Sequence, residues 1–229
     1  MKNISILITY HNMDLKIFKE TLQSCIKFKV PIIIVNDFST KKNTSALKKY
    51  LKNLDLDNIT LANTSKNLYI TDAILFGLNY IKTDYTVRVD QDDLLLDIYE
   101  NFSNYDIVFR KSNCTSYNEW LLKRNGIPLT GVIMKTKILK QIYENSPFMK
   151  TIEKIIPEDL YHFLKLLIFK ETESLTSIIA PSQVYLYRPN LGNMNKTKRL
   201  KKECRQQLVQ ELLILDKLLD ENYNIIKKE

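Results

Sequence analysis

Short apolar runs alternate with amphipathic segments along the first half of the chain. The runs are rich in β-branched residues, which favours strands, and the segments between them have apolar residues at helical spacing. The predicted strands are 4–10, 32–35, 59–62 and the run that starts at Tyr85. The predicted helices are 15–26, 44–54 and 71–81. This order is typical of an α/β fold with a mostly parallel central sheet flanked by helices.

Polar residues follow three of these strands at the point where each strand ends. They are Thr9, Tyr10 and Asn12 at the first strand, Asn36 and Asp37 at the second, and Asp90, Asp92 and Asp93 at the fourth. In open α/β sheets, ligands bind beyond the carboxyl ends of the strands. The sequence therefore predicts a ligand site at this edge of the sheet.

The acidic residues at the end of the fourth strand are unusually crowded. Three carboxylates lie within four positions, from Asp90 to Asp93, and each one makes ionisation of the next more costly. A divalent cation removes this cost, because hard cations prefer oxygen ligands. If the strand continued, Asp90 and Asp92 would point to the same side. The alternative interpretation is a solvated acidic turn.

The second half of the chain has a looser pattern. Strands are expected at 105–110, 131–134 and 183–188, and helices at 137–143 and from 157 onward. From Thr197 the chain predicts one amphipathic helix with a basic start and leucines on one side. That helix could pack on the preceding domain, dimerise, or lie on an anionic membrane surface.

Composition narrows the classes of protein. The chain has 229 residues, a net charge of +8, and 45% hydrophobic residues, which suits a globular domain that binds phosphates or another anionic surface. The three cysteines are far apart and predict reduced thiols in a cytoplasmic protein, without a disulfide frame. The four glycines form neither a Walker loop nor a dinucleotide-binding fingerprint. The basic helix leaves open a peripheral location at the inner face of a membrane.

Several short motifs occur along the chain in a fixed order. They are 6–12, 35–39, 67–77, Val89-Asp90-Gln91-Asp92-Asp93, 131–134, Pro157-Glu158-Asp159 and 185–188. In this order they resemble the motifs of family 2 glycosyltransferases of the GT-A fold, and the resemblance covers roughly residues 4 to 195. The resemblance implies a GT-A catalytic domain at 1–195, with a nucleotide-sugar half at 1–110 and an acceptor half at 111–195. The amphipathic helix at 196–229 would then be a C-terminal extension.

The resemblance also implies roles for individual residues. The expected enzyme moves a sugar from a nucleotide-sugar, with a UDP-linked donor favoured, to a saccharide or lipid-linked acceptor with inversion, in surface polysaccharide or glycolipid synthesis. Asp90 and Asp92 would hold Mn²⁺ or Mg²⁺, and Asp159 would be the catalytic base. The expected donor contacts are Thr9, Tyr10, Asn12, Asp37, Asp90, Asp93 and Arg188. For Arg188, pairing with an acidic residue of the protein is an equal alternative.

The chain departs from the family pattern at Asn36, Leu75 and Asn190, and the 67–69 segment lacks the usual glycine. Two other functions remain open. A sugar-phosphate nucleotidyltransferase would also use acidic metal ligands, although the glycine-rich loop expected after its first strand is absent. A basic nucleic-acid-binding protein would use the lysine-rich helices, although no reader module is recognisable.

Overall fold

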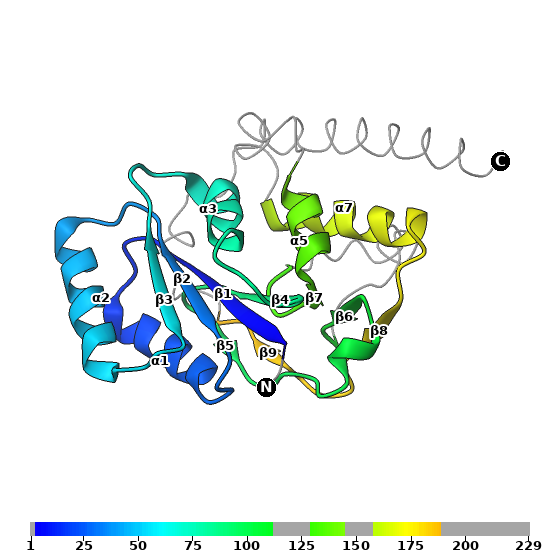
Figure 1. The fold of residues 1–229 in the computed structure, drawn as a ribbon, viewed down its shortest axis with the longest axis horizontal. Helices are drawn as coiled ribbons and strands as arrows, with labels where there is room; N and C mark the ends of the chain where they lie inside the picture. The colour runs from blue at the N-terminus through cyan, green and yellow to red at the C-terminus, as the bar shows by residue number, and fades with distance from the viewer. Residues whose placement is uncertain (1–2, 112–128, 145–157, 189–229) are drawn as a thin grey trace.

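A computed structural model describes residues 3–111, 129–144 and 158–188 of the chain. Its centre is a seven-stranded sheet in the order β3-β2-β1-β4-β7-β6-β8, with helices on both faces (Figure 1). The strands are β1 (Ile4–Tyr10), β2 (Ile32–Asn36), β3 (Ile59–Asn63), β4 (Tyr85–Val89), β6 (Ile107–Phe109), β7 (Ile133–Lys135) and β8 (Ser177–Ile179). The helices are α1 (Leu15–Ile26), α2 (Lys41–Leu54), α3 (Tyr69–Leu78), α5 (Thr136–Tyr143) and α7 (Glu158–Thr172), with a 3₁₀ turn, η1 (Phe102–Asn104).

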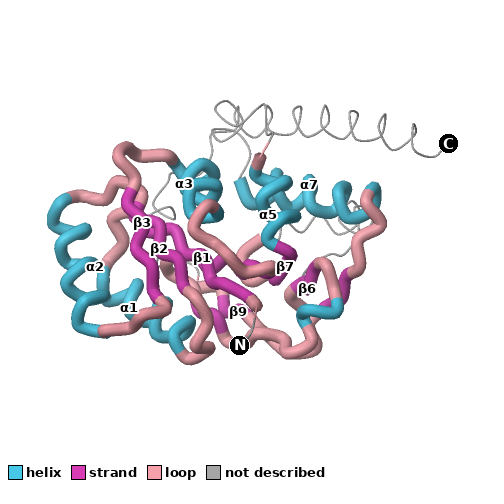
Figure 2. Tube along the Cα trace, viewed as in Figure 1, coloured by secondary structure: helices cyan, strands magenta, loops and turns pink. Residues whose placement is uncertain are grey.

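Strand direction confirms the expected mostly parallel sheet. β3, β2, β1 and β4 are parallel neighbours, whereas β7 is antiparallel to both β4 and β6. β8 is parallel to β6. Because β7 runs against both of its neighbours, β6 and β8 point in the same direction as β4. The carboxyl ends of six strands therefore lie at one edge, and loops lead from there to the next elements (Figure 2).

Most predicted elements are confirmed, and the differences have local causes. α2 begins at Lys41 because the side chain of Thr40 caps it by accepting a hydrogen bond from the Asn43 amide. The short strand β8 was not expected: it has only three residues, two of them half-buried and the third, Ile179, exposed. The strand expected at 183–188 is present as β9 (Tyr185–Leu186), but its antiparallel partner β5 (Leu94–Leu95), and with it the second sheet, was missed. Pairs this short have no periodic signal in the sequence.

The core lies in two layers, one on each face of the sheet. Alternate residues of β1 face opposite layers, as strand geometry requires. Ile6 and Ile8 pack in the layer that contains Phe18 of α1. Leu7 packs in the other layer with Ile74 of α3, and residues of α5 and α7 extend that layer. All seven residues of β1 are buried, as expected for a central strand covered on both sides.

Asp106, which precedes β6, links the three strands at the β8 end of the sheet. Its carboxylate lies 2.6 Å from Lys135 Nζ, at the end of β7, and accepts hydrogen bonds from the amide and hydroxyl of Thr176, just before β8. Burial raises the pKa of Asp106, but the hydrogen bonds from Lys135 and Thr176 outweigh it and lower the pKa to about 2. One ionised side chain thus holds three strands in register.

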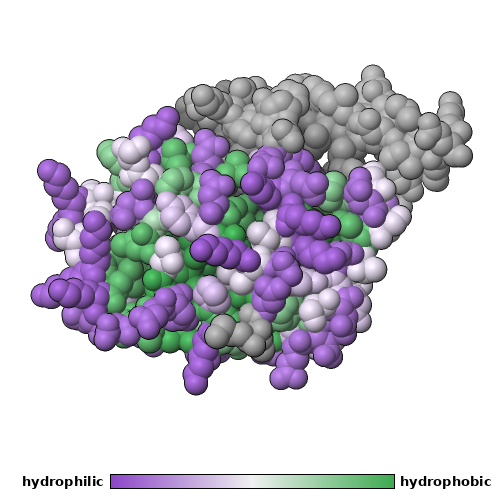
Figure 3. Space-filling model, viewed as in Figure 1, coloured by the Kyte–Doolittle hydropathy of each residue, from purple (hydrophilic) through white to green (hydrophobic). Residues whose placement is uncertain are grey.

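Charged residues dominate the outer surface. Exposed lysines line α2, and hydrophilic side chains occupy the margin where α2 lies (Figure 3). Among the residues that the structure describes, no helix has the length and apolar character needed to cross a bilayer. The amphipathic helix expected at 196–229 and the domain boundary at 195 lie outside the described residues, and both stay predictions.

Candidate functional site

The ends of three adjacent strands form one continuous edge. β2, β1 and β4 are neighbours in the sheet, so the residues that follow them meet there. The amide of Asp37 donates to the carbonyl of Tyr10 at 2.8 Å and joins the ends of β2 and β1. The convergence expected from the sequence is therefore present between the first two strands, and the acidic segment after β4 lies beside them.

His11 links all three strand ends, a role that the sequence analysis did not anticipate. Its amide donates to Gln91 Oε1 at 2.9 Å, and its Nδ1 lies 2.5 Å from the carbonyl oxygen of Asp37. Its Nε2 lies 3.1 Å from Asn12 Nδ2. Nδ1 therefore carries the proton and Nε2 accepts. The only available signal was the position of His11 directly after a strand, which carries little information alone.

Asn12 and Asp37 use their side chains to shape the loops around this edge. Asn12 has a positive φ of 50°, and its Oδ1 accepts from the Thr40 amide at 2.8 Å, ahead of α2. Asp37 is 4% exposed, and its Oδ1 accepts from the Thr64 hydroxyl at 3.1 Å and the Leu68 amide at 2.8 Å. Both of these hydrogen bonds go to Oδ1, which leaves Oδ2 of Asp37 for a ligand.

Thr9 and Tyr10 lie at the same edge, but the side chain of Tyr10 belongs to the core. Thr9 is 8% exposed. Tyr10 is 1% exposed, its ring packs edge-on against Phe18, and its hydroxyl donates to the Met13 carbonyl at 2.9 Å. Nucleotide contacts by Thr9, Tyr10 and Asn12 stay predictions.

The acidic segment after β4 is a turn. β4 ends at Val89, and the amide of Asp93 donates to the carbonyl of Asp90 at 3.2 Å. The extended backbone ends before Asp90, so the condition under which strand alternation would point Asp90 and Asp92 to the same side is not met. The carboxylate of Asp90 lies 3.2 Å from the buried guanidinium of Arg88, and its side chain is 26% exposed. Arg88 thus holds Asp90 from the buried side, and the side chain of Asp90 remains partly exposed to solvent.

Asp92 shows the electrostatic cost expected of crowded acids. Burial raises the pKa of its carboxyl, and the neighbouring charge of Asp90 raises it further. A divalent cation between these groups would remove both penalties. Among the described residues, no group of three or more His, Cys, Asp or Glu side chains is arranged to hold a metal ion. An ion held by only two protein carboxylates takes its other oxygens from a bound diphosphate and water, and metal binding by Asp90 and Asp92 stays a prediction.

Asp93 is enclosed within the protein. It is 0% exposed, its Oδ2 accepts from the hydroxyl of Tyr185 at 2.7 Å, and its Oδ1 accepts from the amide of Arg188 at 2.7 Å. Burial is the main cause that raises its pKa to about 6. The hydroxyl of Tyr185 also accepts from the Asp90 amide at 3.2 Å. Asp93 and Tyr185 therefore support the acidic turn from behind, and the contact of Asp93 with a donor stays a prediction.

Arg188 follows β9 and closes over the acidic turn. Its guanidinium binds Glu20 Oε2 of α1 at 2.5 Å and donates to the backbone carbonyl of Asp92. It also donates to the Thr21 hydroxyl at 3.2 Å. Pairing with an acidic side chain, one of the two alternatives from the sequence, is thus present, and a phosphate contact stays a prediction.

Asp159 is the second residue of α7, at the start of the helix as expected, although only the backbone is described there. His162, one turn later, is 0% exposed and stacks on Tyr143 with ring centroids 4.1 Å apart. The hydroxyl of Tyr143 accepts a hydrogen bond from Arg88. A chain of contacts therefore connects α7, which carries Asp159, to Arg88 beneath Asp90. The catalytic role of Asp159 stays a prediction.

Comparison with known proteins identifies the fold. Residues 5–109 match the model of glycosyl transferase family 2. A search of curated protein sequences finds no significant match.

Solved structures with the same architecture share little sequence with the chain. S. aureus TarS 1-349 in complex with UDP-GlcNAc is 16% identical, with a TM-score of 0.60 over 92% of this chain and 66% of that one. GalNAc-T7 with UDP, GalNAc and Mn²⁺ is 11% identical, with a TM-score of 0.59 over 87% of this chain and 45% of that one. Mannosyltransferase PcManGT from Pyrobaculum calidifontis in complex with GDP-Man and Mn²⁺ is 13% identical, with a TM-score of 0.55 over 81% of this chain and 56% of that one.

The chain spans between 45% and 66% of the length of these three structures. At such low identity the likeness concerns the fold, and the family match concerns the nucleotide-sugar half expected from the sequence. The acidic turn and the ends of β1 and β2 all lie within the matched residues. The resemblance noted in the sequence is therefore confirmed at the level of fold and motif: the chain has the GT-A fold, and its residues 5–109 match the model of glycosyl transferase family 2.

Proposed function

We propose that the chain is a metal-dependent glycosyltransferase that moves a sugar from a nucleotide-sugar, with UDP as the favoured carrier, to a saccharide or lipid-linked acceptor. The observation that carries the proposal is the meeting of Asp37, His11 and the Asp90–Asp93 turn at one sheet edge. The structures with the same fold include complexes with UDP-GlcNAc and with Mn²⁺. Surface polysaccharide or glycolipid synthesis is the expected setting, with the enzyme on the cytoplasmic side.

The residues that follow β1, β2 and β4 bind the donor. Asp37 Oδ2 accepts hydrogen bonds from the nucleobase or ribose, beside Thr9 and Asn12. Asp90 and Asp92 hold Mn²⁺ or Mg²⁺ against the diphosphate. When bound, the ion stabilises the negative charge that grows on the diphosphate as the anomeric bond breaks. Arg88 fixes the orientation of Asp90 from the buried side.

Transfer also needs a base for the acceptor hydroxyl, which is a weak nucleophile. Asp159 takes that proton as the hydroxyl attacks, and attack from the face opposite the diphosphate inverts the anomeric centre. A positioned general base contributes on the order of 10²- to 10⁴-fold in rate. The stacking of His162 on Tyr143 supports this assignment, because Tyr143 also contacts Arg88 in β4, the strand that leads into Asp90.

Calorimetry with UDP, GDP and CDP, each with and without Mn²⁺, tests donor binding. We expect one nucleotide, UDP in the first instance, to bind only when the metal is present. Asp92→Asn should abolish the binding of the nucleotide that depends on Mn²⁺. Asp57→Asn, which removes an exposed carboxylate ahead of β3, is the matched control and should bind like the wild type. If none of the nucleotides binds with Mn²⁺, the proposal is wrong.

Asp159→Asn separates a base from a structural residue. We expect transfer to fall by about 100-fold or more, as loss of a general base predicts, while the affinity for the donor nucleotide stays unchanged. Loss of both would assign Asp159 a structural role. The anomeric configuration of the product, read by proton NMR, tests inversion.

The same measurements address the two alternatives. A nucleotidyltransferase would release pyrophosphate from a nucleoside triphosphate and a sugar phosphate. A nucleic-acid-binding protein would bind DNA without metal, with an affinity that falls steeply as salt rises.

A further inference from the structure

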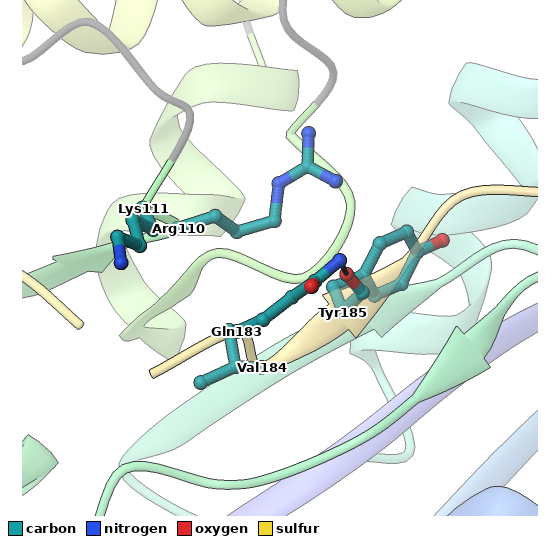
Figure 4. Close-up of a pocket in the computed structure, with 5 residues that line it drawn as sticks. All are labelled: Arg110, Lys111, Gln183, Val184 and Tyr185. Carbon is teal, nitrogen blue, oxygen red and sulfur yellow. Dashed lines mark hydrogen bonds between the residues drawn. The ribbon is translucent and has the colours of Figure 1, made fainter. Parts of the chain in front are cut away.

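A cavity of about 270 Å³ opens beside the acidic turn and has no role in the donor site described above. Its lining residues are Arg110, Lys111, Gln183, Val184 and Tyr185 (Figure 4). The size is near the lower end for small-molecule pockets. Of the lining residues that the structure describes, Arg110 and Lys111 are cationic and none is a carboxylate, so this part of the wall is basic.

Arg110 gives the pocket a fixed cation. It follows β6 directly and is 8% exposed, and its guanidinium carbon lies 5.0 Å from the ring centroid of Tyr185. Stacking on an aromatic face holds the planar guanidinium in one orientation. Gln183 extends along the same wall, where its amide donates to the carbonyl of Tyr185 at 3.3 Å (Figure 4). Lys111, which is exposed, adds a second cationic side chain to the lining.

Tyr185 places this pocket next to the reaction centre. The ring of Tyr185 packs against Arg110, and its hydroxyl contacts the Asp90 amide and the Asp93 carboxylate. β6 points in the same direction as β4, so Arg110 and Asp90 lie at the same edge of the sheet. The nucleotide side of that edge is at β1 and β2, and the pocket lies on the opposite side of β4. A molecule in the pocket would therefore approach the transferred sugar from the side opposite the nucleotide.

We propose that this pocket binds a phosphate group carried by the acceptor, with Arg110 and Lys111 as the anion-binding residues. This inference rests on the proposed function, since the acceptor is defined by sugar transfer. A rigid guanidinium matches the geometry of phosphate oxygens, and a neighbouring lysine adds charge without demanding one orientation. The phosphate fixes the acceptor, and the hydroxyl to be glycosylated lies on the part that reaches toward the acidic turn.

The binding test uses small probes in place of the unidentified acceptor. Glycerol 3-phosphate, glycerol and the diester glycerophosphoglycerol are titrated by ligand-observed NMR in EDTA, which removes metal-dependent diphosphate binding. We expect glycerol 3-phosphate or the diester to bind and glycerol not to bind. Preference for the monoester indicates an acceptor with a terminal phosphate, and preference for the diester indicates a phosphate-linked chain.

Variants assign the binding to the pocket. Arg110→Gln and Lys111→Gln should each weaken binding of the phosphate probe, by about tenfold or more for Arg110, as expected for loss of a hydrogen bond to a charged group. Lys111→Gln changes an exposed side chain, so it tests the pocket even if Arg110→Gln fails to fold. Lys48→Gln removes the same charge on α2, at the far end of the molecule, and should have no effect (Figure 1).

Two outcomes overturn the inference: no binding of either phosphate probe, or binding that survives both pocket substitutions. Titration of UDP with Mn²⁺ on the same preparations keeps the two proposals separate. If UDP binds and the phosphate probes do not, the pocket inference fails and the donor site stands. If the probes bind through Arg110 and no nucleotide binds, the proposed glycosyltransferase function is wrong. The phosphate site can then no longer be assigned to an acceptor.

Discussion

Replacing Tyr185 with phenylalanine removes a buried hydroxyl that supports the acidic turn from inside the protein. This hydroxyl donates to Asp93 at 2.7 Å and accepts from the Asp90 amide at 3.2 Å, and Tyr185 is 3% exposed. Loss of a hydrogen bond to a buried charged group costs about 1.5–3 kcal/mol, and the Asp90 amide loses a partner as well. The expected loss in free energy of unfolding is therefore about 2–4 kcal/mol.

Two measurements follow from this estimate. Urea denaturation should report the loss of stability, and the melting temperature should fall by about 2–4 °C for each kcal/mol in a chain of this size. The affinity for UDP with Mn²⁺ should fall about tenfold or more, as is typical when a group behind a metal ligand is removed. The second effect is expected because the hydroxyl positions the backbone of Asp90.

Tyr85→Phe is the matched control. Tyr85 is 6% exposed, and its hydroxyl lies 3.1 Å from the carbonyl oxygens of Ser103 and Tyr105, away from the acidic turn. Its loss should cost about 1 kcal/mol, typical of a neutral hydrogen bond, and should leave nucleotide affinity unchanged. The reasoning is refuted if Tyr185→Phe is no less stable than Tyr85→Phe, or if it keeps wild-type affinity for UDP and Mn²⁺.

Three further substitutions test the fold around the site. Asp106→Asn should lower the free energy of unfolding by about 1–2 kcal/mol at neutral pH after allowance for solvent screening. Because the folded pKa of Asp106, about 2, is below its ordinary value of 3.8, this difference should be present above pH 4 and vanish as pH falls through 2 in acid-titrated urea denaturation. Gly77→Ala places a methyl group 2.5 Å from a Leu7 methyl carbon, so overpacking should cost about 1–3 kcal/mol, read by thermal melting with nucleotide binding unchanged. Gly131→Ala should lower both stability and UDP affinity, because Gly131 has a φ of +75° and the new methyl group would lie 2.6 Å from the Tyr185 ring. Equal affinity in the two glycine variants would contradict a link between the Tyr185 ring and the site.

Local pattern was enough to predict the parallel half of the sheet. β1 and β2 are near-continuous apolar runs, and α1 has apolar residues at helical spacing with Asp14 as its cap, a role confirmed by the hydrogen bond from the Lys16 amide. Each of these signals involves residues close in sequence, so it can be read without knowing the fold. The order of the elements then placed Asp37 and Asp90 at one sheet edge.

The contacts that support the site could not be predicted in this way. Tyr185 meets Asp93 across 92 positions, Arg188 meets Glu20 across 168, and His11 meets Gln91 across 80. The two-residue strand β5 has no periodic signal of its own and forms because it pairs with β9. The sequence left the path of the chain after Val89 open, since the direction of the acidic turn depends on these distant partners.

The amino-acid sequence alone determined the fold class, the family resemblance and the identity of the acidic residues, because these depend on local periodicity and on short motifs in a fixed order. Only the tertiary structure decided what each acidic residue touches. It buried Asp93 against Tyr185, left the side chain of Asp90 partly exposed above Arg88, and opened a cationic pocket beside them. Burial and charge pairing depend on residues brought together from distant parts of the chain, and no local pattern records which of them will meet.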